Sequence, residues 1–287
     1  MKILPNQPNL AYLRREAQAV KARHRAKDTS VCSIVGHYDT SLHGLSEQQI
    51  FNQHFSILDA QRVVARQYAF SSWSRLKLFV LKSSDTTELN SELSKLILER
   101  KCTYDAYLKR FKKTKWKDNA IRKWDNFNRE SGDIFENIYD KYGWPGPNII
   151  GREAVEASFC LTAANSNDST FQKLTTKLMK EALPKGECFG IMYASLVDRC
   201  LSLSYRPTIY GTNYDFNEQT GRVELSRNVI DPENLDKRRA EVGLPGFESQ
   251  YLEDIEIQLK RKQLQTDRED WEQYKRKTAL KCGYIEA

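Results

Sequence analysis

The strongest local pattern in the chain is Tyr142-Gly143-Trp144-Pro145-Gly146-Pro147-Asn148-Ile149-Ile150-Gly151-Arg152-Glu153-Ala154. Two prolines and three glycines in so short a stretch predict an extended turn, and helix-forming residues resume at Arg152. Amphipathic periodicity predicts helices on both sides of it, over residues 88–110, 171–181 and 188–203. We therefore predict a mainly α-helical fold in which this turn lies between helices.

A small β-hairpin is expected near residues 206–226. Residues 206–213 predict a short strand that enters a turn, and Thr220-Gly221 predicts a second turn before the apolar and polar alternation of residues 222–225. After Tyr251 the chain predicts a long charged helix, which either closes the domain or forms a homodimer contact. Its packing positions are Leu252, Ile255, Leu259 and Leu264.

The first 85 residues predict a separate helical part. Asn9 is a candidate N-cap for a helix with one apolar stripe, and Ser46 begins a capping-box sequence. Residues 58–80 predict a helical hairpin in which Asp59 caps the first helix and Ser71 or Ser72 caps the second. The polar run at residues 83–87 then separates an N-terminal part, 1–85, from a second part, 86–287.

Charge is distributed unevenly between these parts. Residues 1–85 hold 12 Lys and Arg against 6 Asp and Glu, whereas residues 86–287 hold 33 against 32. A basic N-terminal part is compatible with an anionic partner such as nucleic acid, but we favour the simpler interpretation that it is the solvated face of a basic helix. Cations and aromatics also alternate over residues 109–117, a pattern that can grip single-stranded nucleic acid. We favour the alternative, a solvated helix face whose aromatic residues Phe111, Trp116 and Trp124 are buried.

Several classes of protein are disfavoured by composition. No apolar run approaches the length of a membrane span, and the first ten residues do not resemble a secretory signal, so we expect a cytoplasmic protein without a membrane partner. The six cysteines are far apart and form no CxxC pair, which predicts reduced thiols and no zinc site. Neither GxxxxGK[ST] nor GxGxxG occurs in a nucleotide-binding context, and we expect no cofactor.

Two stretches resemble known bacterial families. Residues 9–82, around Asp59-Ala60-Gln61 and Ser72-Trp73, resemble a helical N-terminal module that precedes ankyrin repeats and other domains, which implies architecture and no activity. Residues 140–255 contain an ordered succession of motifs, formed by Gly143, Trp144, Pro145, Gly151, Phe171, Gln172, Asp198, Arg199, Tyr210, Gly211, Thr212, Asp231, Pro232, Asp236, Arg238, Arg239, Gly243 and Leu244. Through these residues the stretch resembles DUF6624, a family of unknown function.

The departures from this family pattern concern polar residues. A His-Ala-Asp at a helix end in the family is replaced here by residues 163–168, Ala-Ala-Asn-Ser-Asn-Asp, and Tyr-Gly-Thr-Gln ends instead in Asn213. All four histidines lie before residue 55. A Ser-His-Asp, Cys-His or histidine-based metal site in the second part is therefore excluded unless the N-terminal part supplies the imidazole.

Three functional hypotheses follow. The first is a ligand-binding or regulatory protein with a polar pocket in the second part, formed by Trp144, Asn165, Asn167, Arg199, Tyr210, Thr212, Asn213 and Arg238. The second is a hydrolase or transferase in which Asp168 or Asp198 is the catalytic carboxylate. The third is nucleic-acid binding through the basic N-terminal part, which we favour less.

Overall fold

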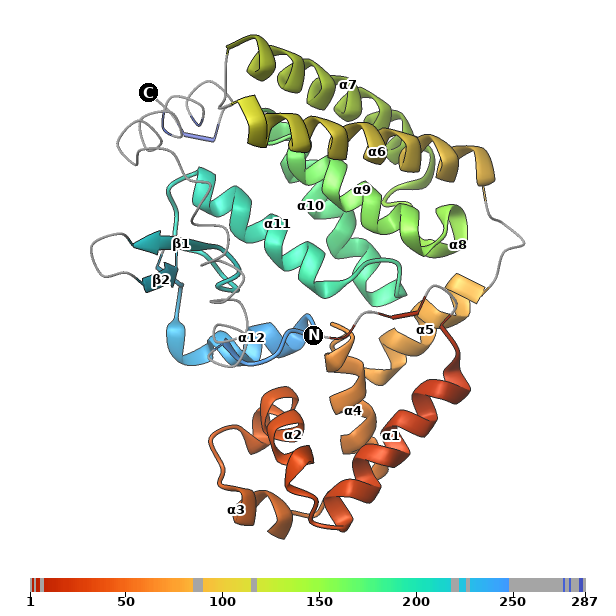
Figure 1. The fold of residues 1–287 in the computed structure, drawn as a ribbon, viewed down its shortest axis with the longest axis vertical. Coiled ribbons are helices and arrows are strands. Elements are labelled where there is room, and N and C mark those ends of the chain that lie inside the picture. Colours follow the sequence, from red (N-terminus) through yellow and green to blue (C-terminus); the bar gives the residue numbers. More distant parts are fainter. Residues whose placement is uncertain are drawn as a thin grey trace.

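The computed structural model describes residues 8–84, 90–114, 118–217, 222–225 and 228–247, together with isolated positions near both ends of the chain. Within these ranges the protein is mainly helical, as predicted. Figure 1 shows the N-terminal helices at one end of the molecule and a layer of longer helices at the other. A two-stranded sheet and a short helix lie along one side between them.

Five helices and two 3-10 turns make up the N-terminal part. The long helix α1 packs on α4 and buries Leu13, Ala17 and Val20, which is the apolar stripe expected from the sequence. Helix α2 also packs on α4, and η2 and α3 contact α2. The bounds are α1 Leu10–Arg25, η1 Thr29–Val31, α2 Cys32–Tyr38, η2 Thr40–Leu42, α3 Glu47–Asn52, α4 Ile57–Gln67 and α5 Trp73–Ser84.

Side-chain caps fix where these helices begin. Asn9 accepts a hydrogen bond from the Ala11 N–H at 2.7 Å, and the capping box predicted at Ser46 is present, so both predictions are confirmed. The predicted cap of α4 was wrong. Ser56 is the N-cap, and Asp59 closes its capping box from the third helical position, because a carboxylate there can accept the N–H of the cap residue.

The second part is built from longer helices packed around α9. Helix α9 contacts α6, α7, α8 and α10, and α10 packs in turn on α11. The predicted extended turn is present only as far as Gly146, because Pro147 begins the short helix α8, where its fixed φ suits a first helical position. Helix α9 starts at Arg152, as predicted. The bounds are α6 Ser91–Thr114, α7 Asp118–Tyr142, α8 Pro147–Ile150, α9 Arg152–Ala164, α10 Ser169–Ala182, η3 Leu183–Lys185, α11 Gly190–Leu203, η4 Pro232–Asn234 and α12 Leu235–Glu241.

The strands differ from the hairpin that the sequence predicted. Strand β1, Tyr214–Asn217, pairs antiparallel with β2, Arg222–Leu225, in a sheet of two strands. Residues 206–213 were expected to form a strand and do not, apart from an isolated bridge between Thr208 and Val229. They form a turn instead, because the α11 side chain described below takes up their N–H groups. Residues 218–221 lie outside the described ranges, as does most of the predicted C-terminal helix.

One cluster of buried apolar residues runs through both parts of the chain. The rings of Phe70 and Phe79, from the N-terminal part, lie 5.3 and 4.6 Å from that of Phe189. Beside them, the Arg75 guanidinium donates to the Glu241 carbonyl at 3.0 Å. The division at residue 85 stays a prediction, and the described residues on its two sides share one core.

Gly243, just after α12, allows the two parts to approach closely. Its φ is +86°, and a Cβ at this position would lie 2.2 Å from the Ser71 nitrogen. Gly143 has a similar φ of +65°, but a Cβ at Gly143 would have no atom within 4 Å.

We expect Gly143→Ala to lower the free energy of unfolding by about 1–2 kcal/mol through backbone strain alone. Gly243→Ala adds a backbone clash, so its loss should exceed about 3 kcal/mol in urea unfolding. Equal losses in the two variants would contradict this close approach.

Candidate functional site

Asp198, on α11, fixes the turn at residues 208–213 from inside. Its side chain is completely buried. One carboxylate oxygen accepts the N–H groups of Ile209 and Tyr210 at 2.8 and 3.0 Å, and the other accepts the N–H and the hydroxyl of Thr212 at 2.8 and 2.9 Å. Burying a carboxylate costs free energy unless donors replace the lost water. Four donors do so here, and Asp198 thereby holds the turn in place.

Two arginines of α12 hold the carbonyl side of the same turn. Arg239 is also completely buried, and its guanidinium donates to the carbonyls of Tyr210 at 2.6 Å and Pro245 at 2.8 Å. Arg238 donates to the Ile209 carbonyl at 3.1 Å. The peptide units of residues 209–211 thus lie between a buried anion and a buried cation, so α11 and α12 are connected through the turn.

The Tyr210 side chain packs beside this turn against Tyr193, with ring centroids 6.1 Å apart. Burial, together with the neighbouring Tyr193 and Asp198, raises the pKa of Tyr210 above its usual range. The raised pKa favours the neutral phenol.

Asp236, also on α12, connects this helix to residues outside the turn. One of its oxygens accepts the Phe247 N–H at 2.7 Å, and the other lies 3.5 Å from Nδ1 of His43. His43 follows the 3-10 turn η2, which buried Asp39 caps by accepting the N–H and hydroxyl of Ser41. A histidine of the N-terminal part is therefore held beside a carboxylate of the second part.

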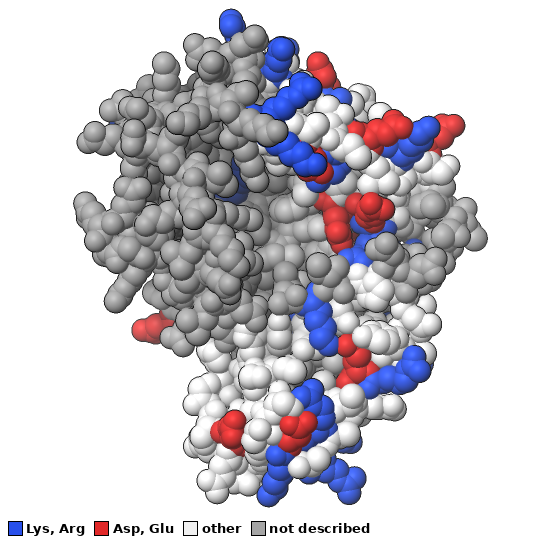
Figure 2. Space-filling view, viewed as in Figure 1, with Lys and Arg blue, Asp and Glu red and all other residues white. Residues whose placement is uncertain are grey.

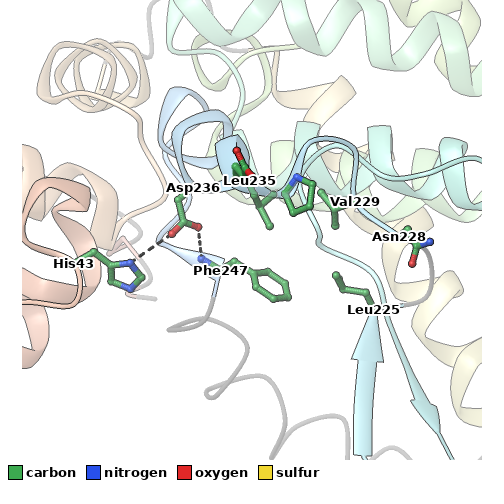
Figure 3. Close-up of a pocket in the computed structure, with 9 residues that line it drawn as sticks. His43, Leu225, Asn228, Val229, Leu235, Asp236 and Phe247 are labelled. Atoms are coloured by element: carbon green, nitrogen blue, oxygen red, sulfur yellow. Dashed lines mark hydrogen bonds and ion pairs between the residues drawn. The ribbon is translucent and has the colours of Figure 1, made fainter.

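A cavity of about 700 Å³ opens beside this pair, as Figure 3 shows. His43 and Asp236 lie at one edge, and the Phe247 ring lies between them and the end of β2. One group of lining residues is polar or charged, and the other is apolar. The polar group is His43, Asn228, Glu233 and Asp236, and the apolar group is Leu225, Val229, Pro232, Leu235 and Phe247.

Gly246 lies against the edge of this cavity. A Cβ on Gly246 would be 3.2 Å from Oδ2 of Asp236 and 3.3 Å from Cε1 of His43, which is closer than ordinary van der Waals contact. The absence of a side chain at this position allows the chain to pass alongside both residues. A larger residue at position 246 would press on both the Asp236 carboxylate and the His43 imidazole.

The site residues predicted from the sequence fall into separate groups. Asp198, Tyr210, Thr212 and Arg238 come together in the turn network, and Asn213 follows it directly. Another group lies where α9 meets α10, and its hydrogen bonds involve different elements. There, buried Asn165 ends α9, Asn167 donates to Asp125 of α7 at 2.7 Å, and Asp168 caps α10 by accepting the Phe171 N–H at 2.9 Å.

Trp144 and Arg199 lie apart from both groups. Trp144 is buried in the core, 6.4 Å from the Tyr139 ring, and Arg199 is exposed on α11. None of the predicted site residues lines the cavity. The pair of His43 and Asp236 was not predicted from the sequence. The sequence did show that any site in the second part that uses an imidazole needs a histidine from the first part, where His24, His37, His43 and His54 lie.

Four of the described cysteines are shielded from solvent to different degrees. Burial raises the pKa of the thiols of Cys32, Cys160, Cys188 and Cys200, which disfavours the nucleophilic thiolate. In the part of the chain that the structure describes, no three His, Cys, Asp or Glu side chains gather closely enough to hold a metal ion. None of the described helices combines the length and apolar composition that a membrane crossing requires.

Comparison with known families gives one match. The profile of a family of unknown function, DUF6624, matches residues 119–262, half of the chain. The chain belongs to this family. No curated protein and no solved structure matches. The match starts within α7, so it leaves out the N-terminal part, and the resemblance of that part to a recurrent helical module stays a prediction.

The DUF6624 segment contains the whole turn network. Asp198, Tyr210, Thr212, Arg238 and Arg239 all lie within the matched residues, and they also carried the resemblance seen in the sequence. Most of their hydrogen bonds are made with peptide groups of residues 209–212. These family motifs therefore hold the turn at residues 208–213 in its conformation.

Replacing the buried carboxylate tests whether Asp198 has this structural effect. Asp198→Asn keeps the size of the side chain but turns an NH2 group toward N–H donors, so we expect a loss of about 3–5 kcal/mol in the free energy of unfolding. Asp168→Asn is the matched control, because asparagine caps a helix as well as aspartate does. Both are measured by urea unfolding. An Asp198→Asn variant as stable as the wild type would refute the structural assignment and leave this carboxylate available for chemistry.

Proposed function

We propose that this DUF6624 protein binds a small molecule in the cavity between His43 and Phe247. The observation that carries the proposal is that both parts of the chain line one cavity, with charged groups at one edge and an apolar wall beside them. A volume of about 700 Å³ lies within the usual range of small-molecule sites, and such sites combine apolar walls with a few polar groups.

The charges of the cavity select the kind of ligand. Glu233 and Asp236 place two carboxylates among the lining residues, and they favour a cationic or hydrogen-bond-donating group. The ring of Phe247 and the side chains of Leu235 and Val229 favour an apolar body. An amine with an aromatic or aliphatic body satisfies both surfaces, whereas a carboxylic acid of the same shape meets like charge.

Binding there also has a regulatory consequence. His43 belongs to the N-terminal part and Asp236 to α12, so a ligand in the cavity that both residues line contacts both parts at once. Its binding free energy stabilises the arrangement in which they are close. This supports the hypothesis of a ligand-responsive protein over that of a purely structural one.

A hydrolase or transferase activity is the second candidate, and the His43–Asp236 pair is the observation that favours it. A carboxylate beside Nδ1 orients an imidazole for general-base work. The lining residues include no serine, threonine or cysteine, so the nucleophile in such a reaction would be water or a second substrate.

Thermal-shift screening of the full chain tests the ligand class. We expect primary amines with apolar bodies to raise Tm by several degrees at saturating concentration, because they bind the native state, and the corresponding carboxylic acids to leave it unchanged. For an amine that binds, Asp236→Asn and Glu233→Gln should each weaken Kd about tenfold or more by calorimetry.

The control variant is Glu181→Gln, which removes an exposed carboxylate of α10 far from the lining residues in sequence and outside the cavity. It should bind the amine as the wild type does. Equal weakening in all three variants, or acids that bind as well as amines, would contradict the proposed selectivity.

A further inference from the structure

The solvent face of α1 carries cations without carboxylates. Arg14, Arg15, Lys21 and Arg25 are exposed on this helix, and Lys27 is exposed just beyond its end. The single acidic residue of α1 is Glu16, which points elsewhere and accepts hydrogen bonds from Lys2 and from the Tyr68 hydroxyl. Figure 2 shows Lys and Arg side chains projecting from the end of the molecule where the N-terminal helices lie.

These five cations make no hydrogen bond or ion pair with the described residues. Other arginines of the same part are paired, since Arg23 binds Asp28 and Arg62 binds Asp59. The face therefore has a local charge of about +5 that the described residues do not compensate. A helix face with several uncompensated cations is typical of proteins that bind an anionic partner.

The cations lie in a row along the helix. Arg14, Lys21 and Arg25 are separated by seven and four residues, so they fall on one stripe about 16 Å long. The exposed residues around them are Ala11, Tyr12, Gln18, Ala19, Ala22 and Ala26. None of these carries a charge, and beyond Arg14 they are alanines and one glutamine, so no bulky side chain separates the cations of the stripe.

A phosphate backbone fits this face better than a lipid surface. Helices that lie on membranes insert an apolar face, and the apolar face of α1, with Leu13, Ala17 and Val20, is buried against α4. A nucleic acid presents closely spaced phosphates and requires only cations, and the guanidinium fork suits phosphate oxygens. We infer that α1 docks against the phosphate backbone of nucleic acid, independently of base sequence.

Salt-dependent binding of the full chain to a labelled DNA duplex of about 20 base pairs tests this inference, with fluorescence anisotropy as the readout. Three to five phosphate contacts predict a slope of log K against log salt between about −2.7 and −4.5. The triple variant Arg14→Glu, Lys21→Glu, Arg25→Glu should bind at least tenfold more weakly, and its slope should be smaller by about 3. A duplex of different sequence should bind equally well.

The matched control reverses three exposed lysines of α10, Lys173, Lys177 and Lys180. It changes the net charge of the protein by the same amount and should retain most of the affinity. A second α1 variant, with glutamine at the same three positions, separates loss of attraction from repulsion and protects the test if the glutamate variant folds poorly.

Three results would overturn the inference. The first is no binding at about 50 mM salt. The second is an equal loss of affinity in the α1 and α10 variants, which would assign binding to total charge. The third is binding to vesicles rich in phosphatidylserine with no binding to DNA, which would assign the face to a membrane surface.

Discussion

Two fully buried charges, the Asp198 carboxylate and the Arg239 guanidinium, hold opposite sides of one turn, and the site depends on them. Each charge is costly to remove from water. Asp198 accepts from the peptide groups of residues 209–212 and from the Thr212 hydroxyl, and Arg239 donates to the carbonyls of Tyr210 and Pro245. Because the donors and acceptors belong to consecutive peptides, small displacements of the turn would break several hydrogen bonds together. The network therefore sets the position of α12 relative to α11.

The position of α12 in turn places the cavity. Asp236 is on the same helix as Arg239, so the hydrogen bonds of Arg239 to the turn also fix where the Asp236 carboxylate lies. The N-terminal part is brought to that carboxylate by close packing after α12, where Gly243 contacts Phe70 and Ser71. Asp198 and Arg239 therefore do not line the cavity themselves. They fix the position of α12, and Asp236 of that helix lines the cavity.

Local features of this fold were predictable from the sequence, and long-range ones were not. The cap at Asn9 and the capping box at Ser46 depend on neighbouring residues alone, so spacing reveals them. Residues 206–213 have the composition of a strand, but Asp198 takes up their N–H groups and imposes a turn, which no local pattern records. The same limit applies to His43 and Asp236, because nothing in the spacing of either residue indicates the other.

The location of the cavity bears on how the matched family segment works within this chain. Residues 119–262 include the turn network and most of the lining residues, yet His43 comes from outside them. The segment alone therefore provides the apolar wall and the carboxylates, and the N-terminal part adds the imidazole at one edge. A different N-terminal part joined to the same turn network would leave the apolar lining residues unchanged and would replace His43 at the edge of the cavity. In this chain the edge of the proposed ligand site and the packing of the two parts consequently depend on the same contact between His43 and Asp236.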